Sequence, residues 1–179
     1  VEEETLGFIR LNIGSGQRPY DMSNGWVNID CISRDGQVPD LLCDVGKESL
    51  PYGEGTVETC CLHHVYEHFN LGAADGLIRE CHRVLRPGGR LLVYVPDMKA
   101  LAQRWIDGGI DDFIFMVNVY GAYQGEIGDI HKWGYTRDTL KQAMMNAAPW
   151  RGVMDTEWMP VPGADIARDW WILGVECVK

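Results

Sequence analysis

The chain has 179 residues, of which 46% are apolar and 23% are charged. This length is enough for one domain with a proper core and too short for two comfortable ones, so we expect a single domain over residues 1–179. The formal net charge of -10 would repel a phosphate backbone, which argues against nucleic acid as a partner.

The first predicted strand covers residues 8–11 and runs into Gly14-Ser15-Gly16. Glycine has no Cβ to hold a ligand away from the backbone, and it permits the tight turn that must follow the strand. A strand that ends this way is typical of a nucleotide-binding floor, although Gly-x-Gly also occurs in ordinary turns.

A second strand over residues 26–30 ends in Asp30. A carboxylate at this point is placed to accept hydrogen bonds from both hydroxyls of a ribose, or it forms a turn at the strand end. Only 30 − 16 = 14 positions separate Gly16 from Asp30, fewer than the ~20 of a dinucleotide fold. We therefore expect the helix between these strands to be short or absent.

Three further strands follow, over residues 38–43, 56–62 and 91–95, and the first of them precedes Asp44. Between the last two, apolar residues at helical spacing predict a helix that stops at residues 86–89, Arg-Pro-Gly-Gly. Strands that alternate with helices and turns predict a mostly parallel sheet with right-handed crossovers.

The sequence His64-Val65-Tyr66-Glu67-His68 has the H-x-x-E-H pattern of a zinc site. On a helix, His64 and His68 would share a face and bind the metal, with Glu67 as the base. The motif directly follows a strand, however, and no acidic third ligand stands at a fixed later spacing, so we expect no metal. His68 then either makes a hydrogen bond at a helix start or lines an acceptor pocket.

In the second half, residues 100–106 predict a helix, and the aromatic segment 112–123 predicts either a lid or substrate wall or a core helix. His131 can accept a proton near neutral pH, and Trp133 and Tyr135 can pack on an acceptor, unless residues 131–135 form only a structural loop. Thr136 is expected to cap a helix. Residues 153–159 and 170–178 predict two final strands joined by a turn at residues 160–163.

Targeting and redox signals point to the cytoplasm. No run of about 18 apolar residues is present to cross a membrane, and residues 1–4 are acidic where a signal peptide would be basic and then apolar. The six cysteines include no Cys-x-x-Cys pair and lie mostly in apolar stretches. This favours buried reduced thiols over disulfides or a zinc cluster.

Five blocks in the order LNIGSG, VNID, CDV…LPYGEGTVE, HHVYEH and RVLRPGGRLLVYVP resemble the class I S-adenosylmethionine-dependent methyltransferases. The resemblance covers roughly residues 8–97, with an echo in residues 131–136. It implies a Rossmann-like three-layer α/β sandwich with a mostly parallel sheet and a C-terminal antiparallel hairpin, and S-adenosyl-L-methionine as the cofactor. The short segment after Gly16 agrees, because this cofactor has no pyrophosphate that needs a helix N-terminus.

The resemblance also assigns roles to residues. Asp30 would hold the ribose hydroxyls, Asp44 the adenine amino group with Val45 beside the ring, and the two glycines would lie beneath the methionine and the ribose. The full set of implied cofactor contacts is Asn12, Gly14, Ser15, Gly16, Asp30, Cys31, Asp44, Val45, Leu62 and His63. Two positions depart from the family's pattern: Asn12 replaces an acid, and Arg18 replaces a third glycine.

The predicted function is methyl transfer to a small-molecule or sugar-like acceptor by a monomer or homodimer. The catalytic candidates are His131, His68 and Tyr135, and the acceptor contacts are His64, Tyr120 and Trp133. Three alternatives stay open. The first is a module that binds the cofactor or S-adenosylhomocysteine without turnover, and Asn12 is its only sequence support. The others are the zinc hydrolase of His64, Glu67 and His68 and a NAD-dependent oxidoreductase.

Overall fold

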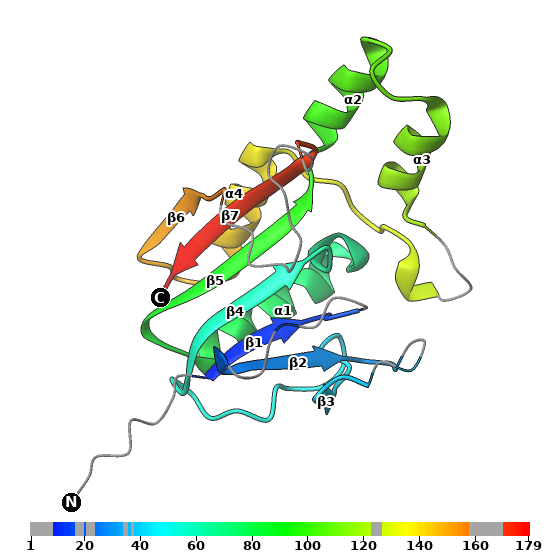
Figure 1. Ribbon diagram of the computed structural model, residues 1–179. Helices are drawn as coiled ribbons and strands as arrows, with labels where there is room; N and C mark the ends of the chain where they lie inside the picture. The colour runs from blue at the N-terminus through cyan, green and yellow to red at the C-terminus, as the bar shows by residue number, and fades with distance from the viewer. Residues whose placement is uncertain are drawn as a thin grey trace, which may run out of the picture.

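Seven strands form one sheet in the order β3-β2-β1-β4-β5-β7-β6, in which all strands but β7 run in the same direction (Figure 1). The computed structural model describes residues 9–16, 20, 24–33, 36, 38–122, 127–157 and 170–179. The strands are β1 (Ile9–Ile13), β2 (Trp26–Asp30), β3 (Leu41–Leu42), β4 (Val57–His63), β5 (Leu85–Pro96), β6 (Gly152–Asp155) and β7 (Ile172–Val178). β7 runs antiparallel to both β5 and β6, which is the predicted closing hairpin.

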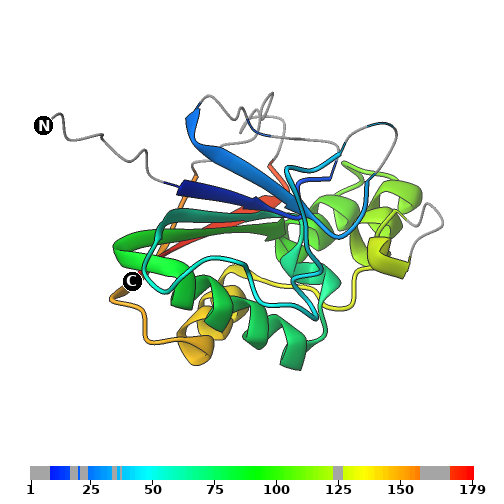
Figure 2. The same cartoon turned by 90° about the horizontal axis from the view of Figure 1, so that it is seen from below.

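Two helices cover one face of this sheet, α1 (Leu71–Val84) and α4 (Arg137–Ala147), as Figure 2 shows. Each begins where the side chain of a preceding residue accepts an amide hydrogen bond, Asn70 for α1 and Thr136 for α4. Their apolar faces bury against alternate strand residues, such as Leu11 and Leu91, and form the main core. A smaller cluster on the other residues of the strands contains Tyr20, Trp26, Cys61, Leu92 and Tyr94.

The predicted fold class is confirmed, and most elements lie within a few residues of their expected bounds. β2 has the bounds that its sequence predicts, and Thr136 caps α4 as expected. β3 is shorter than the predicted strand over residues 38–43, because only two of its residues pair with β2. Residues 86–89 belong to β5 instead of forming a separate turn. The turn at residues 160–163, Arg18, and residues 123–126 lie outside the described residues.

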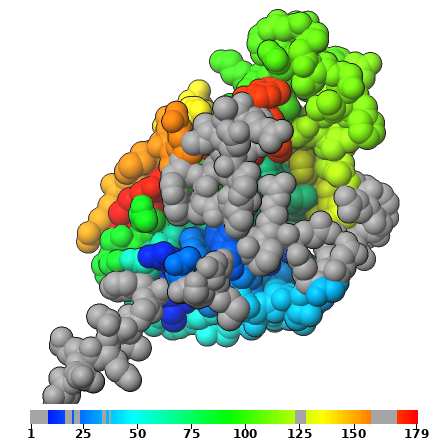
Figure 3. Space-filling model, viewed as in Figure 1, coloured from blue at the N-terminus to red at the C-terminus, as the bar shows by residue number. Residues whose placement is uncertain are grey.

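The aromatic segment after residue 111 forms the helix α3 (Asp112–Tyr120), which follows α2 (Met98–Ile106). α3 has no buried residue, and Phe113 is 76% exposed, so the core-helix alternative is wrong. Together α2 and α3 project from one corner of the molecule (Figures 1 and 3). None of the described helices is both long and apolar enough to cross a membrane.

The strand order places β1 beside β4, and this is the point where the direction of winding changes. Ile13 at the end of β1 pairs with Ile29 of β2 on one side and with Leu62 of β4 on the other. The carboxyl ends of these strands therefore lie at one edge of the sheet. In open α/β sheets, ligands bind in the crevice outside this edge at the switch point.

Candidate active site

The loop after β1 and the end of β2 are joined by the carboxylate of Asp30. The amide of Gly16 donates to Asp30 Oδ2 at 2.8 Å, and the amide of Ile32 donates to Oδ1 at 3.2 Å. Gly16 has φ +52°, and apart from its chain neighbours no described residue has an atom within 4 Å of the position where a Cβ would stand. On this side, the backbone at Gly16 is therefore not covered by described residues, and the Asp30 carboxylate lies beside it.

Asp44 lies at the same edge, one strand further. The amide of Cys43 donates to the carbonyl of Asp30 at 2.9 Å, which aligns the two strand ends. A hydrogen bond from Lys47 at 2.8 Å lowers the pKa of Asp44 although burial opposes it. Burial raises the pKa of the Cys31 thiol, and the charges of Asp30 and Asp44 raise it further. Asp30, Cys31 and Asp44 are thus close enough to share one electrostatic environment.

At the end of β4, the chain turns sharply at His64 and enters the short 3-10 helix η2 (Tyr66–His68). His64 has φ +56°, a left-handed conformation that costs energy for any residue with a Cβ. Its Nδ1 lies 2.9 Å from Glu67 Oε1, and its ring lies against Trp171. Strain of this kind persists only where surrounding contacts enforce it, and such positions cluster at functional sites.

Glu67 is a buried carboxylate, with a side chain only 1% exposed. Burial raises the pKa of Glu67, but the hydrogen bond with His64 and the charges of His64 and His68 outweigh it, so its pKa lies below the ordinary value. Glu67 is therefore ionised at neutral pH. Its second oxygen, Oε2, is fully buried and has no hydrogen-bond partner among the described residues.

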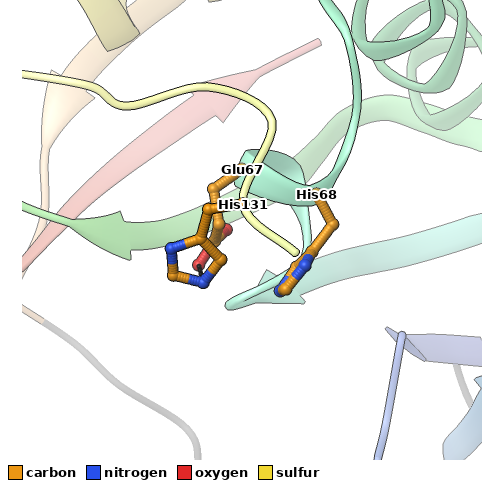
Figure 4. A group of neighbouring side chains, drawn as sticks. All are labelled: Glu67, His68 and His131. Carbon is orange, nitrogen blue, oxygen red and sulfur yellow. Dashed lines mark ion pairs between the residues drawn. The ribbon is translucent and has the colours of Figure 1, made fainter. Parts of the chain in front are cut away.

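The segment after the 3-10 helix η3 (Ile127–Asp129) passes over η2 and adds His131 to this group (Figure 4). The amides of Lys132 and Trp133 donate to the backbone carbonyl of Glu67 at 2.8 and 3.2 Å. They hold His131 Nε2 at 4.0 Å from Glu67 Oε1. Burial lowers the pKa of His131, which is therefore neutral at neutral pH.

The other ring nitrogens of the two histidines are occupied by backbone carbonyls. His131 Nδ1 lies 2.9 Å from the carbonyl of Asn118, and His68 Nδ1 lies 3.2 Å from that of Ile130. Since a carbonyl only accepts, each Nδ1 carries the proton. The neutral form of each ring therefore has its lone pair on Nε2. The two rings meet edge to face, with centroids 4.8 Å apart.

Residues 22–93 match the family profile of the methyltransferase domain. Among curated protein sequences, none is significantly similar to this chain. Solved structures share the fold at low sequence identity, which makes the likeness one of fold alone.

A S-adenosylmethionine-dependent methyltransferase from Archaeoglobus fulgidus has a TM-score of 0.61 at 12% identity, over 97% of this chain and 87% of that one. A Burkholderia thailandensis 1,6-didemethyltoxoflavin-N1-methyltransferase, solved with 1,6-didemethyltoxoflavin and S-adenosylhomocysteine, has a TM-score of 0.58 at 15% identity, over 96% and 70%. A S-adenosylmethionine-dependent methyltransferase from Mesorhizobium loti has a TM-score of 0.58 at 16% identity, over 97% and 91%.

Residues 22–93 thus match a methyltransferase domain, and the fold is shared with solved S-adenosylmethionine-dependent methyltransferases. Groups at the sheet edge suit S-adenosylmethionine, the cofactor named for these solved structures. The open backbone at Gly16 leaves room for a ligand, and the adjoining Asp30 carboxylate can accept from ribose hydroxyls. Ser15 lies between the two glycines, and its amide donates to the backbone carbonyl of Ile29 at 3.0 Å.

Two of the residues that the methyltransferase resemblance assigns to the cofactor serve the fold instead. Asn12 is buried, and its amide donates to Asn28 Oδ1 at 2.9 Å, so the side chain lies between β1 and β2. At Gly14, φ is +70° and a methyl group of Val65 fills the space of a Cβ. Gly14 is required for this close approach, and its side-chain face is closed to a ligand.

Leu62 and His63 lie at the end of β4, beside the glycine loop. The Leu62 side chain is completely buried in the main core, so it offers a ligand only its backbone. The His63 ring is partly buried between those of His64 and Tyr94. A shallow depression between residues 45–49 and α1 includes Val45 but no other residue of the predicted cofactor set.

Tyr135 does not fit its predicted catalytic role. Its side chain is 1% exposed and its ring stacks on Tyr66 in the core, with centroids 5.0 Å apart. Burial raises the pKa of Tyr135 far above the range in which a tyrosine exchanges protons near neutral pH. Trp133 and Tyr120, by contrast, are exposed, and the Tyr120 carbonyl accepts from the amide of His131 at 3.0 Å.

The H-x-x-E-H motif does not form the site that its spacing predicts. His64 precedes η2, so it shares no helix face with His68, and it binds Glu67 instead. The structure brings Glu67 and His68 together with His131, which is 63 positions away from His68 in the sequence. The hydrolase arrangement of His64, Glu67 and His68 is therefore not assembled.

Proposed function

We propose that this methyltransferase moves a methyl group from S-adenosylmethionine to a small-molecule or sugar-like acceptor held at the group of His64, Glu67, His68 and His131. The observation that carries the proposal is the contact between Gly14 and Val65. It joins the loop beside Asp30 to the start of η2, so a cofactor site and a group of proton-accepting side chains lie at adjacent strand ends.

Cofactor binding is assigned to the β1, β2 and β3 ends. S-adenosylmethionine supplies an electrophilic methyl group on a sulfonium. Asp30 and the backbone at Gly16 are proposed to hold its ribose, and Asp44 with Val45 its adenine. Asp30 and Asp44 are half-buried at the carboxyl ends of neighbouring strands, and Cys31 beside them is exposed.

Acceptor binding is assigned to the other side of the switch point. His131 is neutral, so its Nε2 lone pair can take a proton from an acceptor hydroxyl as the new bond forms, or from an ammonium group before the freed amine attacks the methyl group. Glu67, held by His64, stabilises the imidazolium that results. Most of the rate gain in such a displacement comes from alignment of acceptor and methyl group.

A small acceptor is favoured by two observations. The net charge of -10 disfavours polyanions such as nucleic acid. The Burkholderia methyltransferase of similar fold was solved with a small heterocyclic compound. The rings of Trp133 and Tyr120 are exposed and offer flat apolar surfaces for such a molecule.

Incubation with S-adenosylmethionine carrying a labelled methyl group and a panel of hydroxylated and amine acceptors tests this function. We expect label in at least one small acceptor, and thermal protection by S-adenosylhomocysteine but not by NAD. Tight cofactor binding without transfer to any acceptor would favour the non-catalytic module instead. Asn12, whose side chain donates to Asn28, remains the only sequence feature that favours that module.

A further inference from the structure

Glu67, His68 and His131 converge on one point, with a ligand atom from each within 4.8 Å of the other two (Figure 4). We propose that these three side chains bind one divalent transition-metal ion beside the cofactor site. Binding of the ion does not require the proposed function, and only its role toward the acceptor rests on that function. With the ion bound, His131 Nε2 is a metal ligand and does not act as the proton acceptor.

The first argument is the unpaired oxygen of Glu67. Oε2 is buried without a hydrogen-bond partner among the described residues. A buried carboxylate oxygen without a hydrogen-bond donor is energetically costly. A cation bound at this point would remove that cost.

The second argument is the way in which each ligand is held from behind. His131 donates from Nδ1 to Asn118, His68 donates from Nδ1 to Ile130, and Glu67 Oε1 accepts from His64. Metal-binding histidines characteristically donate their other ring nitrogen to a carbonyl, which fixes the tautomer and aims the lone pair at the metal. Both Nε2 atoms are thereby left as ligands.

The ligand types narrow the identity of the ion. Two imidazoles and one carboxylate suit Mn²⁺, Fe²⁺, Co²⁺ or Zn²⁺, whereas Mg²⁺ and Ca²⁺ prefer ligand sets made of oxygen. The present separations exceed the roughly 3–3.5 Å expected between neighbouring ligands at bond lengths of about 2.1 Å. A bound ion would therefore draw the three groups together slightly.

Three protein ligands leave coordination positions open. His68 and His131 are only partly buried, so these positions are accessible from the crevice where the acceptor is proposed to lie. A metal ion of this class lowers the pKa of a hydroxyl bound to it. The site would accordingly favour an acceptor that binds through oxygen.

Titration of chelator-treated, tag-free protein with Co²⁺ tests the site, because imidazole ligation changes the visible absorption of this ion. We expect one Co²⁺ per chain, displaced by Zn²⁺ and not by equimolar Mg²⁺. The variants Glu67→Gln and His131→Ala should bind more than about tenfold more weakly. The matched control is His82→Ala, because His82 lies on α1 against Trp150 and outside the group.

Calorimetric titration of each variant with S-adenosylhomocysteine separates the two proposals. Two results would overturn the metal site: a parent protein that binds no stoichiometric Co²⁺, or equal Co²⁺ affinity in all variants. If S-adenosylhomocysteine still binds in either case, the proposed function stays intact. Stoichiometric Co²⁺ in a protein that binds no S-adenosylhomocysteine would overturn the proposed function and leave the metal site. Loss of both in one variant indicates misfolding, and the other variant then decides.

Discussion

A methyl group of Val65 occupies the space that a Cβ on Gly14 would fill. Val65 immediately precedes η2, and Gly14 begins the loop after β1, so this contact fixes the distance between the two halves of the site. A larger residue at position 14 would have to displace the start of η2 and with it Glu67.

Replacement of Gly14 by alanine is expected to lower the free energy of unfolding by about 3 kcal/mol, because both the left-handed backbone and the clash with Val65 are unfavourable. Gly16→Ala has the same backbone strain but open space, so it should cost about 1–2 kcal/mol. Urea unfolding measures both. The double variant Gly14→Ala/Val65→Ala should lose less free energy of unfolding than the sum of the losses in the two single variants. Equal costs for the two alanine variants would contradict the packing argument.

Asp30→Ala is expected to weaken binding of S-adenosylhomocysteine by about 10- to 100-fold, the value of hydrogen bonds to a charged group. Isothermal calorimetry measures the change. Asp155→Ala is the control, because Asp155 pairs with Arg137 and Lys141 at the opposite edge of the sheet. Unchanged affinity in the Asp30 variant would refute the assignment of this carboxylate to the ribose.

His131→Ala is expected to lower kcat by about 100-fold with any acceptor found in the labelled-transfer assay, through the loss of a proton acceptor. Its affinity for S-adenosylhomocysteine should remain unchanged. Tyr135→Phe serves as the control, because the buried hydroxyl of Tyr135 takes no part in the proposed reaction, and its turnover should equal that of the parent. A larger loss of turnover in Tyr135→Phe than in His131→Ala would reverse the two assignments.

Acid should destabilise the fold in part through Glu80. The hydrogen bond from Arg83 lowers the pKa of Glu80 below its ordinary value of 4.5 although burial opposes it, and the amide of Leu50 adds to this effect. The carboxylate's contribution is therefore complete above pH 4.5 and is lost as the pH falls through the lowered pKa. Urea unfolding of Glu80→Gln from neutral to acidic pH should show a smaller loss than the parent. The exposed Glu48→Gln variant should lose as much as the parent, and a parallel curve for Glu80→Gln would count against this account.

Local patterns in the sequence were sufficient for the sheet. The short apolar stretch that ends at Asp30 marks β2, and the threonine before α4 marks the start of that helix, because these features depend on neighbours within a few positions. Since parallel strands end at one edge, Asp30 and Asp44 could also be expected to lie together. α3 was ambiguous because its apolar residues lie all around the helix, and such a pattern does not distinguish a core helix from a projecting one.

The group at Glu67 could not be derived in the same way. Sequence spacing suggested His64 and His68 as partners, but the left-handed turn at His64 removes it from the helix. His131 joins the group only because the segment after η3 bonds to the Glu67 carbonyl, a contact between distant parts of the chain. The role of Val65 at Gly14 likewise depends on tertiary packing, and no periodicity reports it.

The hydrogen bond from His131 Nδ1 to the backbone carbonyl of Asn118 connects the site to α3. Because this hydrogen bond holds the imidazole, a displacement of α3 would move the ring relative to Glu67. The geometry at Glu67 is therefore coupled to the position of an exposed helix. A substitution on the outer surface of α3 can therefore alter the chemistry without touching any reacting atom.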